Sequence, residues 1–194
     1  MICTLLEAEI ISLDRFRHWH EFQRLITEAE WRRALQAISV SELTYLNEKL
    51  TGWLAGYTRQ ELDDHFETQL RELDLAAILS LVAATEAALR REYERRANRR
   101  LKDAVSRDFL SHWQVRKAKI RLEDLLDVWR DKFDLISQDL AERRELKQAI
   151  ANFKDILNVR HWLAHGRSWE VRPGQEISVE YVAEVSEVLF DLAC

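Results

Sequence analysis

Glycine and proline are scarce in this sequence. Its 194 residues contain four glycines and one proline, about 3% together against an average near 12%. β-Sandwiches, barrels and hairpin-rich folds need many more turn residues than this. The glycines are Gly52, Gly56, Gly166 and Gly174, so neither a dinucleotide-binding nor a phosphate-binding glycine loop is present. With 47% hydrophobic residues to build a core, the sequence predicts an all-α fold.

Cysteines and long apolar runs are also few. Cys3 and Cys194 lie at opposite ends of the sequence, so we expect no disulfide framework and a reducing, cytoplasmic location. Glu7 and Glu9 stand where a secretory signal would carry basic residues. The longest apolar stretch, 75–84, is shorter than the roughly 20 residues of a membrane span. We therefore expect a buried helix at 75–84 and no membrane partner.

Helical periodicity and capping residues predict the first half of the chain. A helix is expected at about 13–38, with Phe16, Trp19, Ile26 and Ala29 near one face, and a second at about 41–55. Thr58 and Glu61 form a capping box that opens a helix to about residue 73. Asp74 is expected to cap the next helix, to about residue 100, whose apolar positions are Ile78, Leu79, Val82, Ala83 and Leu89.

The same signals predict four helices in the second half, at about 104–118, 122–134, 137–165 and 178–194. Ser137 or Asp139 caps the third, Gly166 ends it, and Ser178 caps the fourth. Their apolar stripes are Leu146, Ile150, Phe153, Leu157 and Ala164, and then Val182, Val185, Leu189 and Leu192. We expect a helical N-terminal extension over 1–73 and a helical domain over 74–194.

Positive charge is concentrated in one segment. The net charge of the chain is −5, yet residues 90–121 contain twelve Lys and Arg against four acidic residues. Such asymmetry indicates a polyanionic partner. The alternative is a solvated helix end whose basic residues complement the helix dipole. Composition alone does not distinguish RNA, DNA and acidic protein.

Most standard enzyme signatures are absent. His18 and His20 are two residues apart and do not share a helix face. The sequence contains no His-Glu-x-x-His motif, no paired cysteines and no Gly-x-Ser-x-Gly elbow. We therefore expect no metal site and no cofactor.

The segment 158–167, Asn-Val-Arg-His-Trp-Leu-Ala-His-Gly-Arg, carries a different pattern. Arg160 is followed by polar His161, and four residues separate Arg160 from His165. Ala164 precedes His165, and Gly166 follows it. This segment resembles the signature of HEPN-domain proteins, in which an arginine and a histidine have this spacing near the end of a long helix. The resemblance extends over about residues 74–194 and implies an all-α, multi-helix bundle of HEPN type.

Three other Arg/His pairs have a compatible spacing: Arg15/His20, Arg59/His65 and Arg107/His112. Arg107/His112 is the closest rival, because polar Asp108 follows the arginine. Only His165 has the Ala-His-Gly context and a long apolar helix before it, so we select Arg160/His165.

The resemblance implies a metal-independent endoribonuclease that acts as a homodimer, with Arg160/His165 pairs from two protomers in one composite site. Arginine stays charged at working pH and binds phosphate. Histidine titrates near neutrality and can transfer the proton of a ribose 2′-hydroxyl. His161, Asn158 and Arg167 are the supporting, RNA-binding candidates, and Trp162 and Trp169 are candidates for RNA stacking or dimer contact. The implied partners are RNA and a cognate antitoxin or inhibitor protein, in a toxin-like or defence role.

Two alternatives remain. Some HEPN members are catalytically silent helical modules that bind a nucleotide or a partner protein, and Arg160 and His165 would then have structural roles. The basic segment 90–121 also permits a DNA-binding role.

Overall fold

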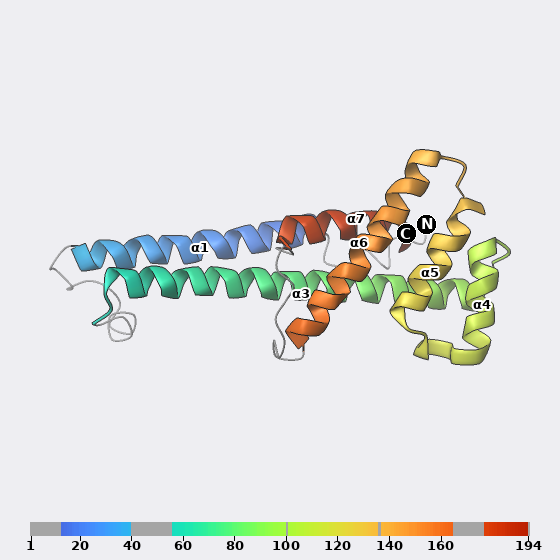
Figure 1. Cartoon of the computed structure of the whole chain (residues 1–194), viewed down its shortest axis with the longest axis horizontal. Coiled ribbons are helices and arrows are strands. Elements are labelled where there is room, and N and C mark those ends of the chain that lie inside the picture. Colours follow the sequence, from blue (N-terminus) through green and yellow to red (C-terminus); the bar gives the residue numbers. More distant parts are fainter. Residues whose placement is uncertain (1–12, 40–55, 100, 136, 165–176, 194) are drawn as a thin grey trace. The chain divides into compact units, whose positions relative to one another are not determined.

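The computed structural model describes residues 13–39, 56–99, 101–135, 137–164 and 177–193 (Figure 1). Within these residues every regular element is a helix, and no strand is present. The predicted all-α class is therefore confirmed for the described part of the chain. The predicted helix at 41–55 lies outside the described residues.

The described residues form six α-helices and two 3-10 turns. Their bounds are α1 (Leu13–Ser39), α3 (Arg59–Arg99), α4 (Ala104–Arg116), α5 (Leu122–Lys132), α6 (Leu140–Ala164) and α7 (Val179–Ala193), with 3-10 turns η2 (Lys117–Lys119) and η3 (Phe133–Leu135).

The chain divides into two compact units between residues 77 and 78, inside α3. We call the described residues 13–39 and 56–77 the N-terminal hairpin, and the described residues from 78 to 193 the C-terminal unit. The predicted boundary after residue 73 remains a prediction.

One continuous helix, α3, replaces the two that were predicted between residues 58 and 100. Neither glycine nor proline interrupts residues 59–99, so the backbone hydrogen bonding continues through position 74. The prediction that Asp74 caps a new helix is wrong. Asp74 lies within α3, and its carboxylate binds side chains of α1 instead.

The N-terminal hairpin pairs α1 with the first half of α3 (Figure 1). Its small core contains Ala34, Leu62 and Phe66. The Trp31 ring stacks on Phe66 with centroids 6.1 Å apart, and Trp31 Nε1 donates to Asp63 Oδ1 at 2.8 Å. These contacts set the register of the two helices at one end of the hairpin.

A polar cluster joins α1 to α3 farther along the hairpin. His20 is buried, and its Nε2 lies 2.8 Å from Asp74 Oδ1. Arg24 donates from Nη1 to both carboxylate oxygens of Asp74, at 2.9 and 2.8 Å. Buried polar groups need such partners to offset the loss of water, so Asp74 serves the pairing of the two helices.

The C-terminal unit has a larger apolar core. A chain of ring contacts runs from Tyr93 of α3 to Phe109 of α4 and on to Trp129 of α5, with centroids 5.2 and 5.6 Å apart. α7 packs on α6, and α5 packs on both α4 and α6. The predicted stripe residues that the structure describes on α6 and α7 are all buried: Leu146, Ile150, Phe153, Leu157, Val182, Val185 and Leu189.

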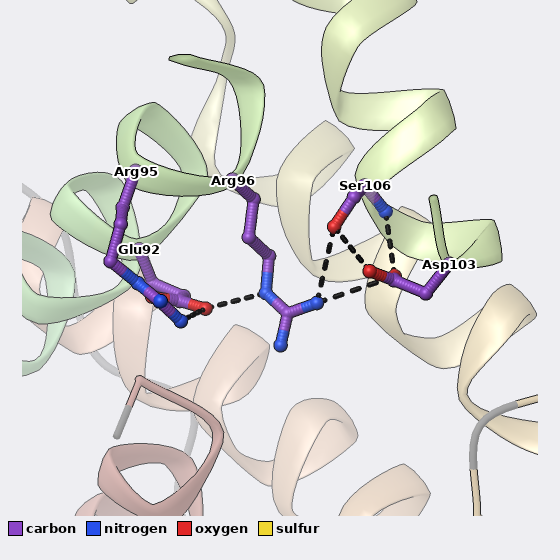
Figure 2. A network of polar contacts seen from close by, with 5 residues as sticks. All are labelled: Glu92, Arg95, Arg96, Asp103 and Ser106. Atoms are coloured by element: carbon purple, nitrogen blue, oxygen red, sulfur yellow. Dashed lines mark hydrogen bonds and ion pairs between the residues drawn. The ribbon is translucent and has the colours of Figure 1, made fainter. Parts of the chain in front are cut away.

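Figure 2 shows a network of charges that joins the end of α3 to the start of α4. The buried carboxylate of Glu92 accepts hydrogen bonds from both Arg95 and Arg96. Arg96 also donates to Asp103 and to Ser106, each at 3.3 Å, and its guanidinium lies 4.7 Å from the centroid of the Trp129 ring. The network therefore fixes where the chain leaves α3 and enters α4.

Local capping agrees with most of the sequence predictions. The capping box at α3 is present, because Thr58 N donates to Glu61 Oε2 at 2.8 Å and Glu61 N donates to Thr58 Oγ1 at 3.3 Å. Asp139 is the residue that caps α6, since its Oδ1 accepts from Ala141 N at 2.7 Å. Ser178 caps α7 through its Oγ, which accepts from Tyr181 N at 3.1 Å.

Some predicted apolar faces are wrong. Trp19 and Ile26 of α1 are exposed although Phe16 is buried, and Leu79 and Ala83 of α3 are exposed although Ile78 and Val82 are buried. Each helix buries only the side that has a neighbour, so apolar residues around the rest of its circumference stay in solvent. Residues 75–84 are consequently buried on one side only.

Candidate functional site

The C-terminal part of α6 carries three of the predicted site residues. Asn158 and His161 are exposed, the Arg160 side chain is 36% exposed, and Val159 between them is buried. His165, Arg167, Gly166 and Trp169 lie outside the described residues, and Trp162 is half-buried.

The helix does not bring all three described residues to one side. An α-helix turns about 100° per residue, so Arg160 lies about 200° around the axis from Asn158. Asn158 and His161 are three residues apart and share a face. Arg160 is thereby separated from Asn158, and a site that uses both would need further residues or a second chain.

Arg160 belongs to a charge cluster contributed by α6 and α3. Its Nη2 lies 3.8 Å from Glu86 Oε2, and Glu86 Oε1 accepts from Arg90 Nε at 2.9 Å. One carboxylate is thus shared between two guanidinium groups, and the cluster keeps a net positive charge. Because arginine remains protonated at every working pH, this charge persists under physiological conditions.

The second arginine of the cluster is anchored to the turn after α4. Arg90 Nη1 donates to the carbonyl oxygen of Ile120 at 3.0 Å. One turn farther along α3, the Tyr93 hydroxyl donates to the carbonyl oxygen of Lys117 at 3.0 Å. Burial, followed by the nearby charge of Glu94, raises the pKa of Tyr93, so its hydroxyl keeps its proton near neutral pH. These two bonds hold residues 117–120 beside Glu86, Arg90 and Tyr93.

The backbone at Lys117 is unusual for a residue with a side chain. Its φ is +49°, a region that non-glycine residues seldom occupy. The Lys117 N–H donates to the Trp113 carbonyl, and its own carbonyl accepts from Tyr93. The surrounding contacts therefore determine this conformation.

The rival Arg/His pairs lie in different settings. His20 is buried and bound to Asp74 within the N-terminal hairpin, so its ring already has a structural partner. His65 Nε2 lies 2.9 Å from Gln69 Nε2 on the same helix. On α4, Arg107 is exposed and His112 is half-buried, and their spacing places them about 140° apart around the axis.

Sequence reasoning missed Glu86 and Arg90 as neighbours of Arg160. Their four-residue spacing is the usual one for an ion pair along a helix, and that signal was available. The approach of α6 to this pair was not, because residues 86 and 160 are far apart in the chain.

Among the described residues, no group of three or more His, Cys, Asp and Glu side chains is arranged to hold a metal ion. The helices that the structure describes also include none that is both long and apolar enough to cross a membrane.

Comparison with known proteins identifies no relative. The sequence matches no family model and no curated protein, and the structure matches no solved structure.

Proposed function

We propose that the chain is a metal-independent endoribonuclease of HEPN type, in which Arg160 binds phosphate and His165 transfers protons. The observation that carries the proposal is the partly exposed Arg160 guanidinium, held at the C-terminal part of α6 in a cluster of net positive charge. His165 enters through the sequence motif alone. The all-α class and the late position of the motif, with α7 after it, suit the bundle that the resemblance implies.

The proposed chemistry begins with attack of a ribose 2′-hydroxyl on the adjacent phosphorus. A histidine removes the hydroxyl proton, the O2′–P bond forms, and the P–O5′ bond breaks. The leaving 5′ oxygen then takes a proton from a second histidine. Arg160 stabilises the negative charge that develops on the non-bridging phosphate oxygens.

A second Arg160 and a second His165 at the same phosphate require a second copy of the segment 158–167. We therefore propose a homodimer whose protomers each contribute Arg160 and His165 to a composite site. The HEPN resemblance implies a toxin-like or defence role with a cognate inhibitor protein, and the scarcity of cysteine favours a cytoplasmic location.

The test is cleavage of a labelled RNA by the purified full-length protein in EDTA. We expect Arg160→Ala and His165→Ala each to lower the rate by about 10² to 10⁴, the range for a lost charge-stabilising or acid–base group. Arg144→Ala is the matched control, because Arg144 is an exposed arginine on the same helix. Absence of cleavage by the parent protein, or equal rates in parent and variants, would overturn the proposal.

The ion pair between Arg160 and Glu86 favours one second candidate, a catalytically silent module in which Arg160 has a structural role. A silent module predicts that the parent protein cuts no RNA, so that Arg160→Ala affects only the stability of the fold. The nuclease predicts lost cleavage with a nearly unchanged free energy of unfolding, since ion pairs this exposed contribute about 0–1 kcal/mol.

A further inference from the structure

Ten of the twelve cations of the basic segment 90–121 fall into two groups in the structure. Five of them pair with carboxylates of the C-terminal unit: Arg90, Arg95, Arg96, Arg116 and Arg121. Five others are exposed, and their charged groups have no partner among the described residues: Arg99, Lys102, Arg107, Lys117 and Lys119. We call this second group the α4 basic surface.

Acidic residues do not neutralise the α4 basic surface. Residues 95–120 contain only two of them, Asp103 and Asp108. Asp103 is engaged by Arg96 and Ser106, and Asp108 lies 3.2 Å from Lys132. The five exposed cations therefore keep their charge for an external partner.

The contacts between α3 and α4 place these cations in order. Ser106 lies beside Arg96, and the carbonyl of Lys117 lies beside Tyr93, so both ends of α4 contact the last turns of α3. Arg99 and Lys102 are consequently at one end of α4, and Lys117 and Lys119 are at the other. Thirteen residues of helix span about 20 Å.

Arg107 lies between the two ends on the side of α4 that faces solvent. Its helical neighbours Ser111 and Gln114 are exposed, whereas Val105, Ser106 and Phe109 on the other side are buried. The outward face of α4 thus carries cationic and hydrogen-bonding side chains along its length.

One end of this surface borders the Arg160 cluster. Ile120 follows Lys119 directly, and its carbonyl oxygen accepts from Arg90. Arg90 shares Glu86 with Arg160. The row of cations therefore ends next to the charged group to which we assign phosphate binding.

We infer that the α4 basic surface binds the phosphate backbone of single-stranded RNA and leads that strand toward Arg160. The inference rests on the proposed nuclease function and names its substrate surface. Separated point charges match a polymer that carries one negative charge per nucleotide. Attack by a 2′-hydroxyl in line with the leaving oxygen requires a flexible nucleotide, which a single strand supplies and a duplex restricts.

The test is binding of a fluorescein-labelled oligouridylate of about 15 nucleotides, within the range of single-strand sites. The protein is the full-length chain with His165→Ala, in EDTA, so that the RNA stays intact. The test variant adds Lys102→Gln, Arg107→Gln and Lys119→Gln. The matched control adds Arg59→Gln, Arg71→Gln and Arg144→Gln, which also remove three exposed cations that have no partner in the described part of the chain.

We expect the test variant to raise Kd about tenfold or more at 0.1 M salt. We also expect the slope of log Kd against log salt to fall by about 2, because each lost contact to a single strand removes about 0.7. The control variant should stay within about twofold of the parent with an unchanged slope. Circular dichroism of the test variant checks that lost binding does not reflect unfolding.

Three results would overturn the inference: equal binding by the test variant and the control variant, no binding by the parent, or equal binding of an RNA duplex of the same length. Cleavage by the protein with His165 restored separates the two proposals. RNA binding that the test variant weakens, in a protein that cuts no RNA, would reject the nuclease and support RNA binding by the α4 basic surface. RNA cleavage with the same KM in the test variant as in the parent would reject RNA binding by the α4 basic surface and support the nuclease.

Discussion

Different kinds of internal contact stabilise the N-terminal hairpin and the C-terminal unit. The hairpin has a small apolar cluster, and polar contacts to Asp63 and Asp74 support it. The C-terminal unit buries large side chains from five helices, among them Trp129, Phe109 and Phe153. The two helices of the hairpin contact each other along one line, whereas the helices of the C-terminal unit enclose a core.

This difference explains which apolar residues stay in solvent. On α1, Trp19, Phe22, Leu25 and Ile26 are between 42% and 60% exposed. In the C-terminal unit, α6 and α7 bury every predicted stripe residue whose side chain the structure describes. Specific polar pairs therefore do more to fix how the helices pair in the hairpin. Apolar packing does more to fix the helix arrangement in the C-terminal unit.

The largest expected effect is at the buried charge of the C-terminal unit. Glu92→Ala leaves Arg95 and Arg96 without their shared carboxylate, whose side chain is 1% exposed. Removing one partner of a buried pair costs about 3–5 kcal/mol, and urea unfolding should show this loss. Glu184→Ala, at an exposed position of α7, should stay within about 0.5 kcal/mol. Equal stabilities of these two variants would contradict the importance of the network.

A smaller effect is expected at the polar cluster of the hairpin. Asp74→Ala removes the partner of His20 and Arg24 together. An unsatisfied buried polar group costs about 1–3 kcal/mol, so hydrogen exchange in α1 should accelerate while exchange in α6 stays unchanged. Asp64→Ala, an exposed position on the same helix, is the control. Equal acceleration in α1 and α6 would show that the two regions unfold as one.

Two helix caps compare the regions directly. Asp103 caps α4, and Thr58 caps α3. Loss of a cap costs about 0.5–2 kcal/mol. We expect Asp103→Ala to cost more than Thr58→Ala, because Asp103 also binds Arg96. Thermal unfolding of both variants measures the difference. A larger loss of stability in Thr58→Ala would show that the contact between Asp103 and Arg96 adds no stability.

The Asp103 effect should depend on pH. Burial alone would raise the pKa of Asp103, but hydrogen bonds from Ser106 and the charge of Arg96 outweigh burial and lower it from the usual 3.8. A lowered pKa means that the ionised carboxylate stabilises the fold above pH 3.8 and that this stability is lost as the pH falls through the folded-state pKa. The stability gap between the parent and Asp103→Ala should therefore narrow below about pH 4. A gap that stays constant down to pH 2 would contradict this account.

The smallest effect is expected at the exposed face of α1. Phe22 is 60% exposed, so Phe22→Gln should change the free energy of unfolding by less than about 0.5 kcal/mol. Differential scanning calorimetry at two protein concentrations measures this. A loss that grows with concentration would indicate that a second copy covers Phe22 in solution.

Local features were the most predictable from the sequence. The capping box at Thr58, the cap at Ser178 and the apolar stripes of α6 and α7 depend on residues within a few positions of each other. The break at Asp74 was wrong because a carboxylate can cap a helix or bind a neighbouring helix. The choice depends on α1, whose pairing with α3 local sequence does not encode.

At the candidate site, too, the local features were predictable and the contacts between distant residues were not. The sequence motif singled out Arg160 through its spacing to His165, and the composition of residues 90–121 showed their surplus of positive charge. The sequence did not show that Glu86 lies between Arg90 and Arg160, or which five exposed cations have no partner among the described residues. Those facts depend on contacts between residues far apart in the chain.

The sequence by itself predicted the all-α class that the described residues show, because so few glycines and prolines supply too few turns for a strand-rich fold. It also determined where most of the described helices begin, through side chains that bond to nearby backbone groups. Only the tertiary structure decided which apolar faces are buried and which charges are paired. Burial and ion pairing require a second surface, and the folded chain supplies that surface from distant residues.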